Sequence, residues 1–427
     1  CQDVQAEAYD YPESFFAETV WRVRRPMPDG DEFAHAAAAL IRAKKPVIIA
    51  GGGVLYSEAT AALRSFAERH GVPVMETQAG KSSLPHDHVL NMGSVGVTGT
   101  AAANALAEEA DVVLAVGTRL QDFTTGSWAL FKNDTLKIIG LNVQPFDAHK
   151  HGALPLVADA RAGLEALNAA LTGWQADPDW TDRAKSGKDD WLTAADGATA
   201  SNNAELPSDA QVIGAVQRAR DNAIVVCAAG GLPGELHKLW KAKGPGSYHM
   251  EYGFSTMGYE IAGGLGVKLA RPDADVVVMV GDGSYMMANS EMVSAIMLGA
   301  KLTIVVLDNA GYGCINRLQM ATGGANFNNL LKDTSHVTLP GIDFAAHAAA
   351  MGAESRKVAS LAELETALQE TESSDRTTVI VIDTDPLIST DAGGHWWDVA
   401  VPEVSDRPQV NAAREAYVTA LKAQRAG

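Results

Sequence analysis

Short apolar runs alternate with longer amphipathic segments in the first half of the chain. The runs predict strands at 46–50, 73–76, 112–116 and 137–142, and the amphipathic segments predict helices at 31–43 and 58–70. Apolar runs without interspersed polar residues are typical of strands that are buried on both faces of a parallel sheet. Residues 31–172 are therefore predicted to form a doubly wound α/β domain.

The same alternation returns after a polar stretch at 173–206, which predicts a linker with a helix of its own. A second α/β domain is predicted at 207–390. Its expected elements are a helix at 209–220 capped by Ser208, a helix at 258–270, and strands at 224–227, 277–280, 304–307 and 377–383. Residues 391–427 follow as a C-terminal segment, with a polar helix from about 409. The fold class is thus α/β, with two doubly wound parallel-sheet domains.

The first 30 residues are irregular and punctuated by prolines, which predicts a connection between domains. The opening residues read like the end of a preceding unit. We therefore expect residues 1–30 to be a linker that follows an absent N-terminal domain.

Composition and charge narrow the classes of protein. The 427 residues are 47% hydrophobic, enough for two or three α/β domains with full cores. A net charge of −18 argues against a nucleic-acid partner, and the basic residues of 22–25 are interpreted as a solvated face. Three scattered cysteines fit a reducing compartment. The sequence shows no membrane span and no signal peptide, so we expect a cytoplasmic protein without a membrane partner.

Two of the predicted strands stop at oxygen ligands. One is followed by Gly281, Asp282, Gly283 and Ser284, and the next by Asp308-Asn309 and Gly311. Magnesium takes about six oxygens, usually with only one or two carboxylates among them. Asp282, the amide of Asn309 and the carbonyl of Gly311 are therefore candidate metal ligands. Gly281, Gly283 and Ser284 are candidates for approaching a diphosphate, because glycine allows a close backbone approach and helix N-termini favour anions.

These motifs resemble the acetolactate synthase-like family of thiamine diphosphate enzymes. The resemblance covers the family's central domain and its diphosphate-binding domain, assigned here to 31–172 and 207–390. It implies thiamine diphosphate and Mg²⁺ as cofactors. It also implies that Met257 is the apolar wedge that bends the cofactor, and that the carbonyl of Ser255 accepts from the aminopyrimidine. The family usually has two asparagines where this chain has Asp308-Asn309, a departure that leaves the expected ligand in place.

The resemblance also implies something that this chain lacks. Family members activate the cofactor with a glutamate from a pyrimidine-binding domain, which would lie before residue 1. No glutamate here matches that position, so the chain by itself is expected to be inactive. The family places its cofactor between subunits, which implies a homodimer or homotetramer.

Within the family, the segments 2–12, 248–253, 308–319 and 396–399 are most similar to members that open a cyclic polyol dione in myo-inositol catabolism. Such a reaction adds water across the bond between two adjacent carbonyls, and the implied product is 5-deoxy-D-glucuronate. The polar candidates for catalysis or substrate contact are His249, Glu251, Tyr252, Glu260, Tyr312 and Asn316. A purely structural role remains an alternative for His249, Glu251, Tyr312 and Asn316.

Several alternatives stay open. The chain could belong to a carboligase of the acetolactate synthase or glyoxylate carboligase type, or be a non-catalytic diphosphate-binding fragment. Gly51-Gly52-Gly53 is either a nucleotide loop or, as we favour, a tight strand-to-helix turn. Trp396 and Trp397 are either a lid or an interface anchor. Cys314 is interpreted as apolar filler, because no base is paired with it.

Overall fold

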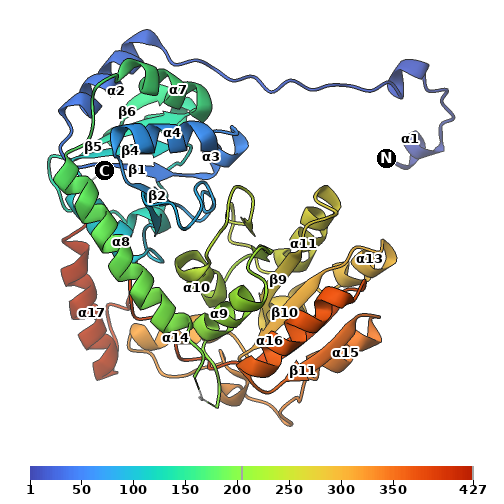
Figure 1. Cartoon of the computed structure of the whole chain (residues 1–427). Helices are drawn as coiled ribbons and strands as arrows, with labels where there is room; N and C mark the ends of the chain where they lie inside the picture. Colours follow the sequence, from blue (N-terminus) through green and yellow to red (C-terminus); the bar gives the residue numbers. More distant parts are fainter. Residues whose placement is uncertain (203–204, 426–427) are drawn as a thin grey trace.

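The computed structural model describes residues 1–202 and 205–425. Residues 203 and 204, within the expected linker, and 426 and 427, at the end of the expected C-terminal segment, lie outside the described residues. Two α/β bodies form the molecule, and an extended N-terminal arm projects away from them (Figure 1). Among the described residues, no helix has the length and apolar content needed to cross a membrane.

The first body is built on a six-stranded parallel sheet with the order β3-β2-β1-β4-β5-β6. Apolar clusters on both faces bury the strands beneath the helices. The strands are β1 (Pro46–Ala50), β2 (Val74–Glu76), β3 (Asn91–Ser94), β4 (Val112–Val116), β5 (Lys137–Asn142) and β6 (Leu154–Val157). The helices are α2 (Gly30–Arg42), α3 (Gly52–Tyr56), α4 (Thr60–His70), α5 (Ala101–Glu109), α6 (Pro145–Ala148) and α7 (Ala160–Ala170). The expected doubly wound domain is confirmed.

The glycine run after β1 packs as a tight turn. A Cβ at Gly51 would meet the carbonyl oxygen of Gly117 at 2.5 Å, because the turn after β1 lies against the turn after β4. Gly53 donates its N–H to the Gly117 carbonyl at 3.0 Å. The run therefore opens the short helix α3, and the helix expected from residue 58 begins at Thr60.

The second body also contains a six-stranded parallel sheet, ordered β11-β12-β10-β9-β7-β8. Its strands are β7 (Ile224–Cys227), β8 (Tyr248–Met250), β9 (Val276–Gly281), β10 (Thr303–Asp308), β11 (Glu354–Val358) and β12 (Thr378–Asp383). Its helices are α9 (Asp209–Ala219), α10 (Gly231–Leu239), α11 (Tyr259–Ala270), α12 (Asp282–Met287), α13 (Glu291–Met297), α14 (Gly313–Ala321), α15 (Phe344–Ala350) and α16 (Leu361–Glu370). After β7 the chain adds β8 on one side and β9 on the other, so the strand order reverses there. Ligands of open α/β sheets bind at such switch points, outside the carboxyl ends of the strands.

Local capping explains where several helices begin and end. Ser208 and Gln211 form a reciprocal capping box at the start of α9, as the sequence predicts. The segment between β9 and β10 is divided into two helices, α12 and α13. Asn289 lies at the break and donates its side-chain amide to the Tyr285 carbonyl at 3.1 Å. Asn favours such local bonds over helix continuation.

The segment expected as a linker instead holds the two bodies together. Helix α8 (Pro178–Thr199) is capped by Asp177 and spans 22 residues along both bodies (Figure 1). Trp180 donates its indole N–H to the Pro46 carbonyl at 3.0 Å in the first body. Trp191 is buried in the core that continues into the second body. The helix is therefore an integral strut.

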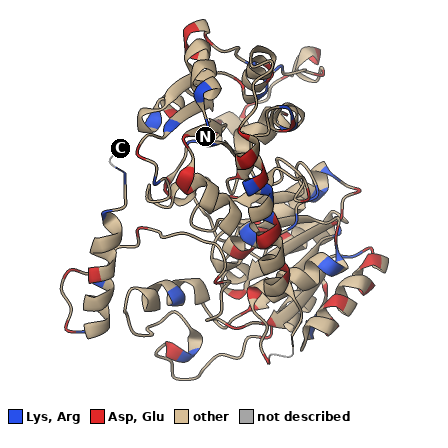
Figure 2. Ribbon diagram, turned by 60° about the vertical axis from the view of Figure 1, so that its left-hand side comes forward, with Lys and Arg blue, Asp and Glu red and all other residues tan. Residues whose placement is uncertain are grey.

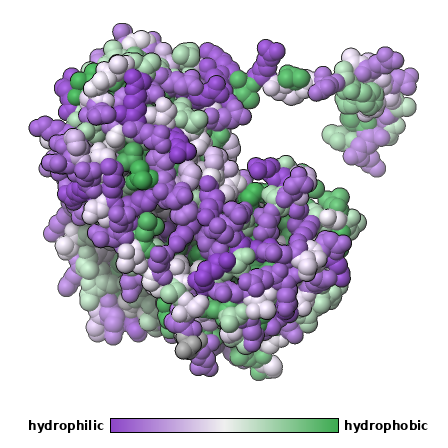
Figure 3. All heavy atoms as spheres, viewed as in Figure 1, coloured by the Kyte–Doolittle hydropathy of each residue, from purple (hydrophilic) through white to green (hydrophobic). Residues whose placement is uncertain are grey.

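The N-terminal arm carries apolar side chains into solvent. It contains α1 (Gln2–Ala6) and a 3₁₀ turn at Glu13–Phe15, and Trp21 is 87% exposed. Figure 3 shows apolar residues gathered on the tip of this arm. The arm rejoins the body where Arg25 pairs with Glu58 and Asp159, each at 3.0 Å. Elsewhere, acidic and basic residues are interspersed along the ribbon (Figure 2).

The C-terminal segment returns to the first body. After β12 it crosses the junction of the two bodies and leads into α17 (Pro408–Leu421). Gln424 and Arg425 donate hydrogen bonds to the carbonyls of Ser127 and Asn133. Residues 424 and 425 are thus anchored to the first body.

Candidate active site

A cavity of about 760 Å³ opens at the carboxyl ends of β7, β9 and β10, where the strand order reverses. Its floor comes from the second body. Its opposite wall comes from the first body, through residues that include Gln78, Thr98 and Gln121. The two bodies are joined behind it by a bond from the Tyr248 hydroxyl to the Gln78 side-chain oxygen at 3.2 Å. Cavities of this volume, placed between two domains, commonly bind small molecules or cofactors.

The predicted metal ligands meet at this edge. The parallel register sets Leu307 beside Gly281, which brings the residues after β9 and β10 together. Asp282 is 5% exposed, and its carboxylate accepts the Gly311 N–H at 2.8 Å. The side-chain oxygen of Asn309 is buried and has no hydrogen-bond partner among the described residues. A buried acceptor without a donor fits a cation ligand, because leaving it unpaired is otherwise costly.

The backbone around these ligands is shaped to present carbonyl oxygens. Gly311 has φ +146°, a conformation that favours glycine, and a Cβ there would collide with the main chain of Asn329 and Leu330. Tyr312 donates its N–H to the Asn329 carbonyl at 2.7 Å, and Gly311 forms a bridge with Leu330. The loop that would supply the third ligand is therefore held by its neighbour at 329–331.

Electrostatics at this edge favour a positive ligand. Burial raises the pKa of Asp282 to about 7, and the neighbouring Asp308 carboxylate adds to the rise. Burial also raises the pKa of Asp308. A divalent cation between them would offset both effects, since an opposite charge favours the ionised carboxylate. The residues present therefore fit a hard cation with oxygen ligands.

The predicted cofactor residues line the same cavity, namely Gly281, Gly283, Ser284, Ser255 and Met257. Gly281 has ordinary extended geometry and open space around its Cα, so its missing side chain leaves room rather than relieving strain. A Cβ at Gly283 would press on the Tyr312 ring at 2.6 Å.

The hydroxyl of Ser284 is already engaged within the protein. It donates to Glu260 at 2.7 Å and accepts the Gly258 N–H at 2.8 Å. Glu260 is 2% exposed and also accepts from Gly258, so it fixes the start of α11. Met257, immediately before this start, is half-buried at the cavity surface. The network therefore holds the Met257 backbone in place, and Glu260 is a buried acid at the cavity.

The polar candidates from the sequence separate into two groups. Tyr252, Glu260 and Tyr312 line the cavity. His249 instead faces a different hollow beside Tyr259 and Arg271, and its ring bonds the Gly246 carbonyl at 3.0 Å. The structure therefore does not bring His249 to the metal ligands.

Glu251 and Asn316 have structural surroundings. The carboxylate of Glu251 accepts the N–H groups of Phe254 and Thr256 at 3.0 and 2.7 Å, and so shapes the loop that carries Ser255, which has φ +55°. Burial works to raise the pKa of Glu251, but these hydrogen bonds bring it below its usual value. The Asn316 side chain is fully buried, with neither polar atom bonded among the described residues.

The C-terminal segment closes one side of the cavity. Trp397 lines it, donates its indole N–H to Asp122 at 2.8 Å, and packs edge-on against Phe123 at 5.6 Å. Asp398 is held by Ser127 and by the Tyr417 hydroxyl, at 2.9 and 2.7 Å. Of the two tryptophans, Trp397 is thus the one placed as a cover.

Several wall residues were missed by the sequence interpretation, namely Gln78, Thr98, Gln121, Asp209, Glu235, Lys238 and Arg317. They come from separate segments, so no local motif marks them. The Gly230-Gly231 pair, two residues beyond the end of β7, was an available signal, since glycines near the end of a strand mark a close backbone approach. Cys314 also lines the wall, and burial raises the pKa of its thiol, which agrees with a role as apolar filler.

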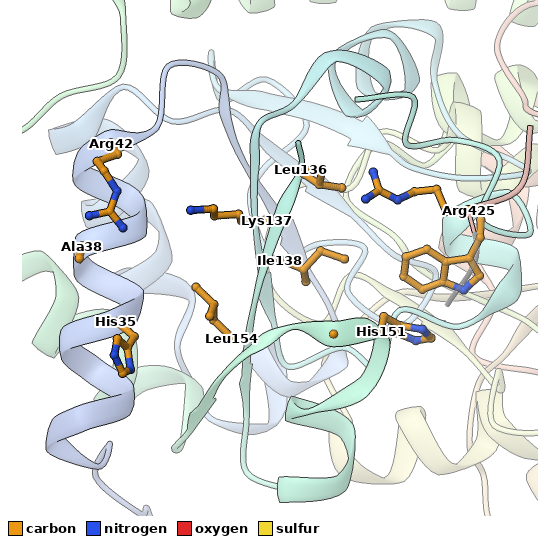
Figure 4. A pocket seen from close by; sticks show the side chains of 11 residues that line it. His35, Ala38, Arg42, Leu136, Lys137, Ile138, His151, Leu154 and Arg425 are labelled. Atoms are coloured by element: carbon orange, nitrogen blue, oxygen red, sulfur yellow. The ribbon is translucent and has the colours of Figure 1, made fainter. Parts of the chain in front are cut away.

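A second hollow lies on the first body, at the amino-terminal edge of its sheet. Figure 4 shows Arg42 and His35 on α2 facing Lys137, which opens β5, with His151 and Arg425 on the other side. The His151 ring stacks on Trp128 with centroids 4.0 Å apart. This hollow is basic. The cavity at the carboxyl edge of the second sheet is instead rich in carboxyl groups.

The fold and the strand-end ligands together define an α/β enzyme class that binds an anionic cofactor at the switch point of a parallel sheet. Residues 33–167 match the thiamine pyrophosphate enzyme central domain, and 228–382 match the C-terminal TPP-binding domain. The chain is 40% identical over 455 aligned positions to "3D-(3,5/4)-trihydroxycyclohexane-1,2-dione hydrolase 2" of Bacillus cereus, an alignment that covers 99% of this chain and 71% of that protein. A similarly named hydrolase of Clostridium tetani is 39% identical, covering 98% of this chain and 70% of that protein. The chain belongs to the thiamine pyrophosphate enzyme family, whose cofactor is thiamine diphosphate.

Proposed function

We propose that the protein containing this chain hydrolyses the C–C bond between the two carbonyls of a cyclic polyhydroxy 1,2-dione, with 3D-(3,5/4)-trihydroxycyclohexane-1,2-dione as substrate. The observation that carries the proposal is the meeting of Asp282, Asn309 and Gly311 at the switch-point cavity. The names of the hydrolases to which the chain is 39–40% identical support the substrate.

We propose that Asp282, the side-chain oxygen of Asn309 and the carbonyl of Gly311 hold Mg²⁺ and, through it, the diphosphate. Gly281 and Gly283 leave space for the phosphates. Met257 and the Ser255 carbonyl face the ring end of the cofactor from the same wall. When bound, thiamine diphosphate supplies a carbon nucleophile and an electron sink at the scissile bond.

The remaining wall would recognise and orient the substrate. A polyol ring offers several hydroxyls, and such a ligand needs donors and acceptors at fixed places. Gln78, Thr98, Gln121 and Tyr252 present amides and hydroxyls to the cavity from the side opposite the metal ligands. Burial raises the pKa of Tyr252 well above its usual value, so its hydroxyl stays protonated and can donate.

The reaction balances with water as the second substrate. Water adds to one carbonyl carbon, the bond to the adjacent carbonyl carbon breaks, and that second carbon takes up a proton. The product is an open-chain aldehyde acid. Trp397 covers the cavity and would keep bulk water away while this proton is delivered.

We further propose that the glutamate that activates the cofactor comes from a pyrimidine-binding domain outside these 427 residues, and that two or more copies assemble around the cofactor. Residues 1–30 would then connect that domain to the central domain at 31–172, and 207–390 would bind the diphosphate. The exposed apolar side chains of the arm support a contact with a further protein surface.

Product analysis tests the assignment. The chain, alone and mixed with a separately produced pyrimidine-binding domain of a hydrolase relative, is incubated with the dione, Mg²⁺ and thiamine diphosphate in ¹⁸O-water. Ring opening with one ¹⁸O in the new carboxylate, seen by mass spectrometry, is the expected result with the mixture. A coupled product formed from pyruvate or glyoxylate, without ring opening, would assign a carboligase. Binding of the cofactor with neither product would indicate a non-catalytic fragment.

A further inference from the structure

Arg317 is a cation of the cavity wall that the metal site does not use. It lies on α14, one turn after the loop that carries Asn309 and Gly311. Its guanidinium Nη1 donates to the Pro386 carbonyl at 2.8 Å. A Cβ on Gly231 would collide with Nη2, so the guanidinium lies directly over the first residue of α10.

A buried carboxyl lines the same cavity wall as this guanidinium. Asp209, the first residue of α9, is 6% exposed, lines the same cavity, and its side chain makes no hydrogen bond among the described residues. Burial raises the pKa of Asp209 to about 7, and Arg317 is the neighbouring charge that opposes this rise. The carboxyls of Glu235 and Asp385 lie near enough to raise it further. Arg317 is therefore the counter-charge of an otherwise acidic corner.

Short contacts connect this corner to the metal ligands. A Cβ built on Gly313 would lie 3.0 Å from the Pro386 carbonyl oxygen and 3.2 Å from the Asn309 side-chain nitrogen. The Pro386 carbonyl is the same atom that binds Arg317. Gly313 thus lies between the Asn309 amide and the carbonyl that holds the guanidinium, so Arg317 and the predicted metal ligands belong to one stretch of the cavity wall.

The surface between the two groups is built from backbone. Gly230 has φ +113°, and Gly231 follows it beneath the guanidinium, at the start of the nine-residue helix α10. Backbone N–H groups at such a helix start and a guanidinium above them recognise a phosphate together, because arginine matches phosphate oxygens with paired donors. A neutral polyol offers no anion to this corner.

We propose that Arg317 binds the terminal phosphate of the cofactor diphosphate from the side opposite the metal. This inference rests on the proposed function, since it assumes that the cavity holds a diphosphate. It adds a phosphate-binding residue that the strand-end motif does not contain. A lysine would supply charge at this place without the paired geometry.

Binding measurements on the 427-residue chain test the proposal. Isothermal titration with Mg²⁺-pyrophosphate, thiamine diphosphate and thiamine monophosphate would compare the native chain with R317Q and R317K. R317Q should weaken pyrophosphate and thiamine diphosphate binding by roughly 10- to 100-fold, the range expected for charged hydrogen bonds. Its preference for the diphosphate over the monophosphate should shrink in proportion. R317K should recover part of the loss.

The matched control is R376Q, which removes an exposed arginine of the same domain that pairs with Glu354 at 3.5 Å. Equal weakening in R376Q and R317Q would overturn the proposal, because general charge would then explain the effect. Unchanged affinity in R317Q, with the native chain binding normally, would overturn it and leave the proposed function standing. Failure of the native chain to bind either diphosphate would count against both. If R317Q does not fold in thermal melts, R317K decides, and native affinity in R317K would overturn the proposal.

Discussion

The two sheets of this protein share one architecture and differ at their carboxyl edges. Both have six parallel strands with helices on each face. In the first sheet the turn after β1 is pressed against the turn after β4, with the Gly53 N–H bonded to the Gly117 carbonyl at 3.0 Å. In the second sheet the corresponding region holds a cavity with a buried Asp282 and an unpaired Asn309 oxygen. Sheet topology provides an edge for binding, but the residues at the strand ends decide whether that edge is filled by backbone or left for a ligand.

The largest contrast between the edges should come from their strand-end side chains. Asp282→Asn removes the charge of the metal site and is expected to weaken Mg²⁺-dependent binding of thiamine diphosphate by roughly 100-fold or more, as for loss of a metal ligand. Asn142→Ala is the control at the end of β5, where the side chain only bonds its own edge. It should leave the affinity unchanged. Titration calorimetry at pH 8 measures both variants. Native affinity in Asp282→Asn would show that Asp282 is not a metal ligand.

The second-largest expected effect is the pH dependence of the stability of the ligand-free chain. The pKa of Asp282 is raised from 3.8 to about 7 in the folded chain. The folded state therefore holds this proton more tightly than the unfolded state. The stabilisation is present below about pH 4 and is lost as pH rises to 7, by at most about 4 kcal/mol. Asp282→Asn should accordingly raise the melting temperature of the ligand-free chain at pH 8 and change it little at pH 4.

The affinity for the proposed metal should change with pH in the opposite direction to stability, because a metal binds the ionised carboxylate. Mg²⁺ affinity should rise between pH 6 and 8 in the native chain. A melting-temperature difference between Asp282→Asn and the native chain that does not change between pH 4 and 8 would contradict the raised pKa. Asn142→Ala serves again as the control.

A glycine exchange should separate the filled edge from the open one. Gly51→Ala forces a methyl group onto the Gly117 carbonyl and is expected to cost about 3 kcal/mol of stability, the range of overpacking. Gly281→Ala meets nothing within 4 Å and has ordinary φ, so its stability should stay native while cofactor affinity falls. Thermal unfolding and calorimetry measure the two effects. Equal destabilisation of both variants would mean that the edges are packed alike.

The smallest expected effect concerns the contact by which the first body covers the cavity of the second. Trp397→Phe removes the indole bond to Asp122 but keeps a ring against Phe123. We expect a loss of about 1 kcal/mol in stability, the worth of one hydrogen bond, and faster hydrogen exchange at residues 122–127. Trp21→Phe, on the exposed arm, is the control. No difference in exchange would argue against Trp397 as a cover.

Central strands were the most predictable part of the fold. β1, β4, β5 and β7 match their expected bounds to the residue, because strands buried on both faces are written as continuous apolar runs. Edge strands were not expected as such. β11 is mostly polar, since an edge strand with a solvated face needs no apolar run. β3 has the sequence Asn-Met-Gly-Ser and is buried, because the side chains of Asn91 and Ser94 donate to the carbonyls of Leu84 and His237.

The site was predictable where its residues are neighbours in sequence. Asp282 and Asn309 each follow a recognisable strand, and parallel register brings them together. Glu251 and His249 were expected near them because they share a short segment. That segment is an edge strand and loop, and the structure gives Glu251 a loop-shaping role and turns His249 to another hollow. Asp209 and Arg317 lie more than a hundred positions apart, so only the folded chain shows that both line the cavity.

The place of Trp397 in the sequence, after both sheets, has a consequence for synthesis. The ribosome makes all twelve strands of the two sheets before it makes Trp397, Gln424 and Arg425, which bond to the first body. Domains fold as they leave the ribosome, beginning from the N-terminus. Both sheets can thus form on a nascent chain whose cavity still lacks the wall that Trp397 supplies. Translation of residues 397–425 then completes that wall.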